Sequence, residues 1–233
     1  MSHSNNNLFW VVIPASGIGS RMQASLPKQY LKINDQPILQ ITINQMAKLN
    51  SKGIVVALAE HDTYFNSLSI NADVQNCIGG KERVNSVLNA LLHVQKQDNS
   101  NPWVLVHDAA RPCVYLNDIQ TLMTHCCDSQ QGGILANKVV DTLKLKQNNK
   151  ISTVDRSNIW QAQTPQCFRL NDLIHAIKQG ISNHTLITDE ASAMEAMGFE
   201  VALIEAKRSN IKITQPEDLA LAQFFLGSKI QVK

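Results

Sequence analysis

The segment LFWVVIPASGIGSRM (residues 8–22) joins a short apolar run, rich in β-branched residues, to a loop that contains two glycines. The apolar run predicts a buried strand. Gly17 and Gly19 would let the backbone turn tightly enough to bring N–H groups against a phosphate. The loop is not a dinucleotide fingerprint, because Met22 stands where the third glycine belongs, and it lacks the Gly-Lys-Ser/Thr of a P-loop. It is a candidate nucleotide loop, with a plain structural turn as the alternative.

Strand-like and helix-like segments alternate along the rest of the chain. Four more apolar runs lie at GIVVALA (53–59), WVLVH (103–107), GGILA (132–136) and EVALIEA (200–206), and helical spacing covers 37–50, 84–95, 117–127, 171–181 and 189–198. This alternation predicts an α/β fold with a largely parallel sheet flanked by helices. A chain of 233 residues lies near the upper end of one ordinary domain. We therefore expect a flexible tail over residues 1–7 and a single domain over residues 8–233.

One stretch breaks this alternation. Residues 141–168 are polar, strand-like and too long for an ordinary connection. We interpret them as a protruding β-hairpin arm with boundaries at about 139–168. Because such an arm has little core of its own, packing on a second copy of the chain would stabilise it. A homodimer is the expected assembly.

The composition argues against several classes of protein. Charged residues make up 17% of the chain and the net charge is +2, with the basic residues scattered, which argues against a nucleic-acid partner. No apolar run reaches the roughly 18 residues of a membrane span. The five cysteines have no zinc-site spacing, and the amino-terminal sequence does not read as a secretory signal. We expect reduced thiols and a cytoplasmic protein with no membrane partner.

Two cations follow Gly17 and Gly19 in the sequence. Arg21 lies in the loop and Lys28 lies in the segment LPKQYL (26–31). A triphosphate needs such partners, since an opposite charge at about 4 Å is worth roughly 4 kcal/mol at an effective dielectric constant of 20. The alternative is a pair of solvated surface cations.

The segment VLVHDAARP (104–112) brings Asp108 and Arg111 to the carboxyl edge of a predicted strand. Ligands of open α/β sheets bind at that edge. Asp108 can hold a magnesium ion or accept a hydrogen bond from a substrate hydroxyl, and a simple helix or turn cap is the alternative. His107 ends the apolar run and is expected to be a hydrogen-bonded core histidine.

Three helix starts carry polar residues. In GGKERVNSV (79–87) paired glycines precede a helix whose amino terminus can receive a base edge or a phosphate. In TDEAS (188–192), Thr188 is the expected N-cap. Lys212 stands just ahead of a predicted carboxyl-terminal helix that Thr214 can cap.

Nine motifs in this order carry a resemblance to a known family. They are PASGIGSRM (14–22), PKQYL (27–31), GGKERVNSV (79–87), HDAARP (107–112), VDTLK (140–144), VDR (154–156), TPQ (164–166), TDEAS (188–192) and NIKITQPEDL (210–219). Together they resemble the 2-C-methyl-D-erythritol 4-phosphate cytidylyltransferases of the non-mevalonate isoprenoid pathway, over about residues 8–226. The resemblance implies a Rossmann-like sheet, a homodimer with crossing arms, and a nucleotidyltransferase that uses CTP with magnesium. Its products would be 4-diphosphocytidyl-2-C-methyl-D-erythritol and pyrophosphate.

The same resemblance assigns roles to individual residues. For CTP it implies Pro14, Ala15, Ser16, Gly17, Gly79, Gly80, Ser86, Asp108 and Ala109. For the acceptor it implies Asp108, Arg111, Thr142, Arg156, Thr164 and Lys212, with Thr142 and Arg156 supplied by the arm of the partner subunit. The catalytic cations would be Arg21, Lys28, Arg156 and Lys212. No metal ligand is assigned.

The chain departs from the family pattern at Ser16, Ser20 and Asn85, which bears on the detail of CTP binding. The closest alternative function is a ribitol 5-phosphate cytidylyltransferase, which differs mainly in its acceptor. A non-catalytic nucleotide-binding module is the alternative of another class.

Overall fold

A computed structural model describes residues 9–17 and 26–227 of the chain. The expected tail at residues 1–7, together with Gly19 and Arg21, lies outside the described residues. Within them, no helix is both long and apolar enough to cross a membrane.

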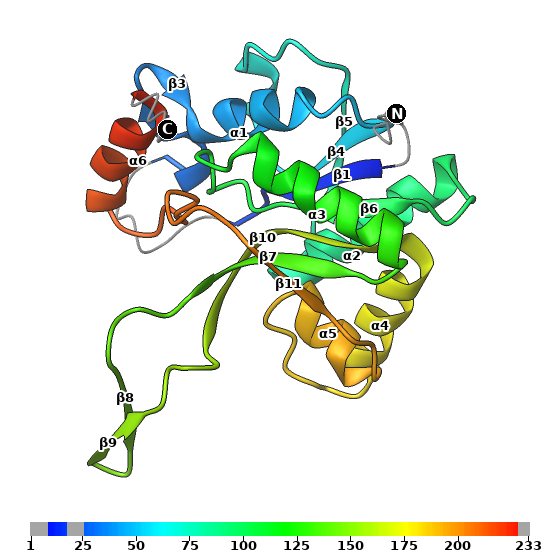
Figure 1. The fold of residues 1–233 in the computed structure, drawn as a ribbon. Coiled ribbons are helices and arrows are strands. Elements are labelled where there is room, and N and C mark those ends of the chain that lie inside the picture. The colour runs from blue at the N-terminus through cyan, green and yellow to red at the C-terminus, as the bar shows by residue number, and fades with distance from the viewer. Residues whose placement is uncertain (1–8, 18–25, 228–233) are drawn as a thin grey trace.

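A seven-stranded sheet forms the centre of the fold (Figure 1), in the order β11-β7-β10-β6-β1-β4-β5. Its strands are β1 (Phe9–Pro14), β4 (Gly53–Leu58), β5 (Val74–Ile78), β6 (Trp103–Val106), β7 (Gly133–Lys138), β10 (Trp160–Arg169) and β11 (Ala202–Glu205). Four of the strand pairs are parallel, and the two pairs made by β10 are antiparallel. The predicted α/β, Rossmann-like fold with a mostly parallel sheet is confirmed.

Helices cover both faces of the sheet. They are α1 (Ile38–Ala47), α2 (Arg83–Gln97), α3 (Leu116–Ser129), α4 (Leu170–Ser182), α5 (Glu190–Ala196) and α6 (Glu217–Gly227). Helices α1 and α3 pack on one face, and α2, α4 and α5 pack on the other (Figure 1). Helix α6 lies beside the small antiparallel pair β2 (Lys32–Ile33) and β3 (Gln36–Pro37) through Ile33 and Ala222.

Strand β1 explains why the sheet is buried on both faces. Successive side chains of a strand point to opposite faces, so Val11 and Ile13 join the core under α1 and α3, while Trp10 and Val12 join the core under α2. All four are nearly or fully buried. The apolar run predicted from the sequence is thus a central strand, and its carboxyl end leads directly to the candidate nucleotide loop.

The arm is shorter than the sequence predicts. Strands β8 (Leu143–Gln147) and β9 (Lys150–Val154) form a two-stranded sheet of their own and project away from the body (Figure 1). Residues 160–168, which the sequence pattern assigns to the arm, instead belong to β10 (Trp160–Arg169) in the middle of the main sheet. Because several of these residues are polar, the sequence pattern does not indicate a buried strand, yet β10 is buried from Gln163 to Phe168.

One helix cap also differs from the prediction. Helix α5 is capped by Asp189 rather than Thr188, because the Asp189 carboxylate reaches the backbone N–H of Ser192 at 2.9 Å. The Ser192 hydroxyl completes a capping box with the backbone N–H of Asp189. This cap fixes the first turn of α5 beside β10, where Gln166 Nε2 donates to Asp189 at 2.9 Å.

Candidate active site

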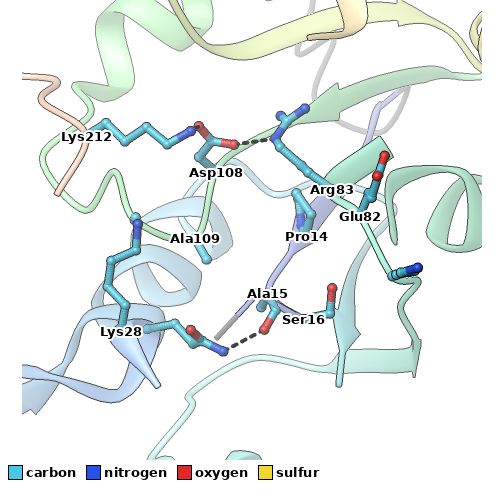
Figure 2. A pocket seen from close by; sticks show the side chains of 13 residues that line it. Pro14, Ala15, Ser16, Lys28, Glu82, Arg83, Asp108, Ala109 and Lys212 are labelled. Atoms are coloured by element: carbon cyan, nitrogen blue, oxygen red, sulfur yellow. Dashed lines mark hydrogen bonds and ion pairs between the residues drawn. The ribbon is translucent and has the colours of Figure 1, made fainter. Parts of the chain in front are cut away.

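A pocket opens at the carboxyl edge of β1 and β6 and beside the amino terminus of α2 (Figure 2). It is lined by Pro14, Ala15, Ser16, Gly17, Lys28, Gln29, Lys81, Glu82, Arg83, Asp108, Ala109, Ala110 and Lys212. Ligands of open α/β sheets bind at this edge. The pocket therefore lies where the sequence motifs place a nucleotide site.

Positive charge predominates among the lining side chains. Lys28, Lys81, Arg83 and Lys212 are basic, whereas only Glu82 and Asp108 are acidic. An excess of two positive charges favours an anionic ligand such as a polyphosphate. This excess is local, because the whole chain carries a net charge of only +2 over 233 residues.

The start of the nucleotide loop packs against the turn between β5 and α2. Ser16 Oγ and Ser86 Oγ lie 2.6 Å apart, and Ser86 Oγ also accepts from the backbone N–H of Gly80 at 3.0 Å. A Cβ added to Gly79 would lie 2.7 Å from the Ser16 Cβ, which leaves no room for a larger residue. Ser86 is fully buried. In this structure Gly79, Gly80 and Ser86 support the loop from behind and do not line the pocket.

A 3-10 helix, Lys28–Tyr30, holds the other side of the pocket. Gln29 is buried, and its Nε2 donates to the Ala15 carbonyl at 2.7 Å (Figure 2). Tyr30 donates its phenolic O–H to Asp62 at 2.6 Å. Burial and the Asp62 carboxylate raise the pKa of Tyr30, so the phenol stays protonated. These contacts tie Lys28 to the end of β1.

Asp108 is the centre of an ion-pair cluster. Its carboxylate pairs with Arg83 Nε at 2.9 Å and with Lys212 Nζ at 2.8 Å (Figure 2), and Arg111 Nε lies 3.6 Å away. Burial would raise the pKa of Asp108, but Arg83 and Lys212 outweigh burial and hold it well below its usual range. Asp108 is therefore a fixed anion, and the simple cap considered from the sequence does not describe it.

A second pocket shares a wall with the first. Arg83, Asp108 and Lys212 line both. The second pocket is completed by Arg111, Ala162, Gln163, Thr164, Gln166, Thr188 and Asp189. Its hydroxyl, amide and basic groups are suited to a small polyhydroxylated anion.

Thr164 and His107 hold this wall in place. Thr164 Oγ1 accepts from the backbone N–H of Asp108 at 3.0 Å and lies 3.1 Å from His107 Nδ1. His107 is fully buried, and its Nε2 lies 3.0 Å from the Arg111 carbonyl oxygen. Burial lowers the pKa of His107 to about 4. The expectation that His107 is a hydrogen-bonded core histidine is confirmed.

The structure brings together most, but not all, of the predicted site residues. Lining the first pocket are Pro14, Ala15, Ser16, Gly17, Lys28, Asp108, Ala109 and Lys212, and lining the second are Asp108, Arg111, Thr164 and Lys212. Arg21 lies outside the described residues. Thr142 and Arg156 are exposed on the arm and line neither pocket of their own subunit.

Several lining residues were not predicted as site residues. They are Gln29, Lys81, Glu82, Arg83 and Ala110 in the first pocket. The sequence does place Glu82 and Arg83 in the first turn of a helix that follows two glycines, and this was the available signal. Glu190, which pairs with Arg83 at 2.7 Å, carries no comparable signal because 107 positions separate the two residues.

The fold is α/β and Rossmann-like, with a basic pocket at the carboxyl edge of its sheet. The family model described as IspD, 2-C-methyl-D-erythritol 4-phosphate cytidylyltransferase, matches residues 9–228. The chain belongs to this family.

Individual relatives agree with the family match over nearly the whole chain. The 2-C-methyl-D-erythritol 4-phosphate cytidylyltransferase of Vibrio parahaemolyticus is 49% identical, with 93% of this chain and 94% of the relative covered. That of Pseudoalteromonas translucida is 48% identical, with 95% and 94% covered. The crystal structure of the Francisella tularensis protein of the same name superposes with a TM-score of 0.80 at 40% identity, covering 93% of this chain and 99% of that one.

Proposed function

We propose that this protein transfers CMP from CTP to 2-C-methyl-D-erythritol 4-phosphate and releases pyrophosphate. The observation that carries the proposal is the pair of pockets that share Arg83, Asp108 and Lys212. A transferase has to hold a donor and an acceptor side by side, and two adjoining pockets with a common basic wall meet that need. The family to which the chain belongs supplies the identity of the two substrates.

The first pocket is suited to the nucleotide. Its loop, Pro14 to Gly17, ends β1, and Lys28 and Lys81 bring positive charge to the same space. The triphosphate would lie against these cations, with Arg21 as an additional partner from the loop. The predicted contacts of Ala109 with CTP fit its place in the lining of this pocket.

The second pocket is suited to the acceptor. Arg111 and Lys212 supply charge for the phosphate, and the amide and hydroxyl groups of Gln163 and Thr188 can pair with the sugar-alcohol hydroxyls. The Thr164 hydroxyl already accepts from the Asp108 backbone and contacts His107. We therefore propose that Thr164 orients Asp108 as well as contacting the acceptor.

The chemistry needs no nucleophilic side chain. A phosphate monoester is largely dianionic at neutral pH because its second pKa is about 6. One of its oxygens attacks the α-phosphorus of CTP, a new phosphorus–oxygen bond forms, and the bond to pyrophosphate breaks in line. Lys28 and Arg21 would stabilise the charge that develops at the α-phosphate and on the leaving pyrophosphate. Lys212, and Arg156 from the arm, would hold the acceptor phosphate.

Magnesium fits this arrangement as an ion carried by the nucleotide. The described residues contain no cluster of three or more His, Cys, Asp or Glu side chains that could form an all-protein site. Magnesium commonly uses one or two carboxylates together with substrate phosphates and water. Asp108 is the carboxylate that would hold it, since its Oδ1 pairs with Arg83 alone among the described residues. When bound, the ion neutralises part of the triphosphate charge.

We propose a homodimer in which each arm completes the site of the other subunit. Thr142 and Arg156 lie on an arm that projects from the body (Figure 1) and line neither pocket of their own chain. The arm also exposes apolar side chains, with Leu145 44% and Ile151 69% exposed, which a partner surface would cover. A cytoplasmic location stays a prediction.

A pyrophosphate-release assay tests the proposed function. The protein is incubated with CTP and magnesium and either 2-C-methyl-D-erythritol 4-phosphate or ribitol 5-phosphate. Release with the first acceptor and little with the second supports the proposal. Faster pyrophosphate release with ribitol 5-phosphate would instead support the alternative function, a ribitol 5-phosphate cytidylyltransferase. CTP binding without release with either acceptor would point to the non-catalytic module.

A further inference from the structure

A buried carboxylate lies behind the wall that the two pockets share. Glu190 occupies the first turn of α5 and is only 2% exposed. Its Oε1 accepts from Arg83 Nη1 at 2.7 Å and its Oε2 accepts from Arg83 Nη2 at 3.1 Å. Glu190 lines neither pocket, and within the described residues its carboxylate contacts the pocket lining through Arg83.

Arg83 is held on two sides. Its two terminal nitrogens donate to Glu190, and its Nε donates to Asp108 at 2.9 Å. A bidentate pair with a carboxylate fixes the plane of the guanidinium group, which a single contact does not. Burial opposes the charged form, but Glu190 and Asp108 more than offset burial and raise the pKa of Arg83. Arg83 is a permanent cation with a fixed orientation.

The fixed guanidinium retains capacity for a ligand. These three bonds use three of its five N–H donors, so two remain when partners are counted over the described residues. The Arg83 side chain is 29% exposed and lines both pockets. The guanidinium group therefore borders the space that a phosphate group bound in either pocket would occupy.

Glu190 is better explained by positioning than by stability. A buried ion pair gains little over a well-packed apolar pair, because desolvation of the two charges offsets their attraction. Here Arg83, which pairs with Glu190, also pairs with Asp108, and Asp108 pairs with Lys212 at 2.8 Å. Loss of Glu190 would free Arg83 to turn away and would leave Asp108 with a poorly aligned partner.

We propose that Glu190 is a positioning residue for the transfer reaction, which holds Arg83 in the shared wall so that Arg83 orients Asp108 and presents N–H donors to the substrate phosphates. The inference rests on the proposed function for its substrates. Arg83 itself contacts the substrate in this scheme, whereas Glu190 acts through it.

The test compares Glu190→Gln with Glu195→Gln. Both variants remove one negative charge from α5, but Glu195 is exposed and, in the part of the chain that the structure describes, lines neither pocket. We expect Glu190→Gln to lower kcat/KM for the acceptor by about 100-fold, the size of a misplacement of roughly 1 Å in a reacting group. The KM for the acceptor should rise and kcat should fall, while Glu195→Gln stays within twofold of wild type. A purely structural role would lower the folded fraction, measured by circular dichroism, and leave both KM values unchanged.

A binding measurement separates this inference from the proposed function. Calorimetric titration with CTP and magnesium, without acceptor, should give a Kd raised roughly tenfold in Glu190→Gln, as for loss of a hydrogen bond to a charged group. Wild-type protein that binds CTP but transfers nothing to 2-C-methyl-D-erythritol 4-phosphate would contradict the proposed function alone. An unchanged CTP Kd together with unchanged kinetic constants in Glu190→Gln would overturn the positioning role.

A double variant covers the case in which Glu190→Gln does not fold. Arg83→Gln/Glu190→Gln removes both charges, so no unpaired charge stays buried. If positioning of Arg83 is the role of Glu190, the double variant folds and shows the raised CTP Kd and the lowered kcat/KM. A folded double variant with wild-type kinetics would refute the proposal.

Discussion

The Thr164 hydroxyl donates a hydrogen bond to Nδ1 of the buried His107 across 3.1 Å. The direction follows from the other ring nitrogen, because His107 Nε2 faces the Arg111 carbonyl oxygen, which can only accept. Nε2 therefore carries the proton and Nδ1 accepts. The neutral ring joins Asp108, through Thr164, to Arg111 in one chain of hydrogen bonds.

The neutral His107 makes the free energy of unfolding depend on pH. The pKa of His107 is about 4 in the folded protein against an ordinary value of 6.5. Below pH 6.5 the unfolded chain binds a proton that the folded protein does not, so the free energy of unfolding decreases as the pH falls from 6.5 to 4. The decrease due to His107 is about 3 kcal/mol. Urea unfolding at several pH values measures it.

His107→Gln should flatten this dependence between pH 4 and 6.5, since no group at that position then titrates. His61→Gln at an exposed position serves as the matched control and should keep the wild-type slope. A His107→Gln protein with the wild-type slope would mean that another group is responsible.

Lys28→Ala should lower kcat by about 100-fold, as removal of a transition-state donor typically does. Lys28 lines the nucleotide pocket, but its helix is anchored by Gln29 and Tyr30, so the fold should persist. Steady-state kinetics with CTP and the acceptor give kcat, and thermal melting reports the fold. Lys32→Ala, an exposed change in the neighbouring β2, is the control. A folded Lys28→Ala protein with wild-type kcat would show that Lys28 does not stabilise the transition state.

Gln29→Ala should both destabilise the protein and weaken CTP binding. Loss of the bond from Gln29 to the Ala15 carbonyl leaves a buried acceptor without this partner, which costs roughly 1–3 kcal/mol. Because the same bond ties Lys28 to the nucleotide loop, the KM for CTP should rise. Gln45→Ala removes a similar bond, to the Val114 carbonyl at 3.0 Å, away from the site. The Gln45→Ala control should lose stability without a change in the KM for CTP. If the KM for CTP is the same in Gln29→Ala and Gln45→Ala, the bond from Gln29 to Ala15 does not position Lys28 for CTP.

Mixed dimers test whether Arg156 acts in the partner's site. Lys28→Ala and Arg156→Ala proteins are each expected to be nearly inactive. After subunit exchange at equal amounts, half of the dimers contain one of each chain, and one of their two sites has both residues intact. About one quarter of wild-type activity should return. If exchange is demonstrated by differential tagging and activity does not return, Arg156 does not act across the interface.

The sequence predicts the parts of the fold that depend on local pattern. The apolar runs at 8–14, 53–59, 103–107, 132–136 and 200–206 all overlap strands of the sheet. Strand β5 was missed because it is a short edge strand, only partly buried, with polar residues between its apolar ones. Strand β10 was assigned to the arm because Gln163 and Gln166 look solvent-exposed, whereas in the fold they pair with Asn210 and with Asp189.

The site likewise contains residues that local motifs predict and residues that only tertiary contacts bring together. Asp108, Lys28 and Lys212 belong to contiguous motifs and were predicted. The bond between Gln29 and Ala15 and the pair between Arg83 and Glu190 depend on tertiary contacts, which join residues 14 and 107 positions apart. No local spacing rule reports such contacts. The motifs thus identify several of the side chains that line the pockets, and they omit contacts such as that of Glu190 with Arg83, which hold lining side chains in place.

The arm begins and ends on two neighbouring strands of the sheet. Lys138 at the end of β7 is paired with Trp160 at the start of β10, and the Val139 N–H donates to the Ile159 carbonyl at 3.1 Å. The intervening segment is therefore a closed insertion, whose length adds only slowly to the entropy of loop closure. The outer part of this insertion can therefore change in length or sequence without altering how the sheet folds. In the homodimer proposed above, such a change would alter the surface by which one subunit contacts the other. The returning strand, β10, is more constrained, because it places Thr164 in the lining of the second pocket.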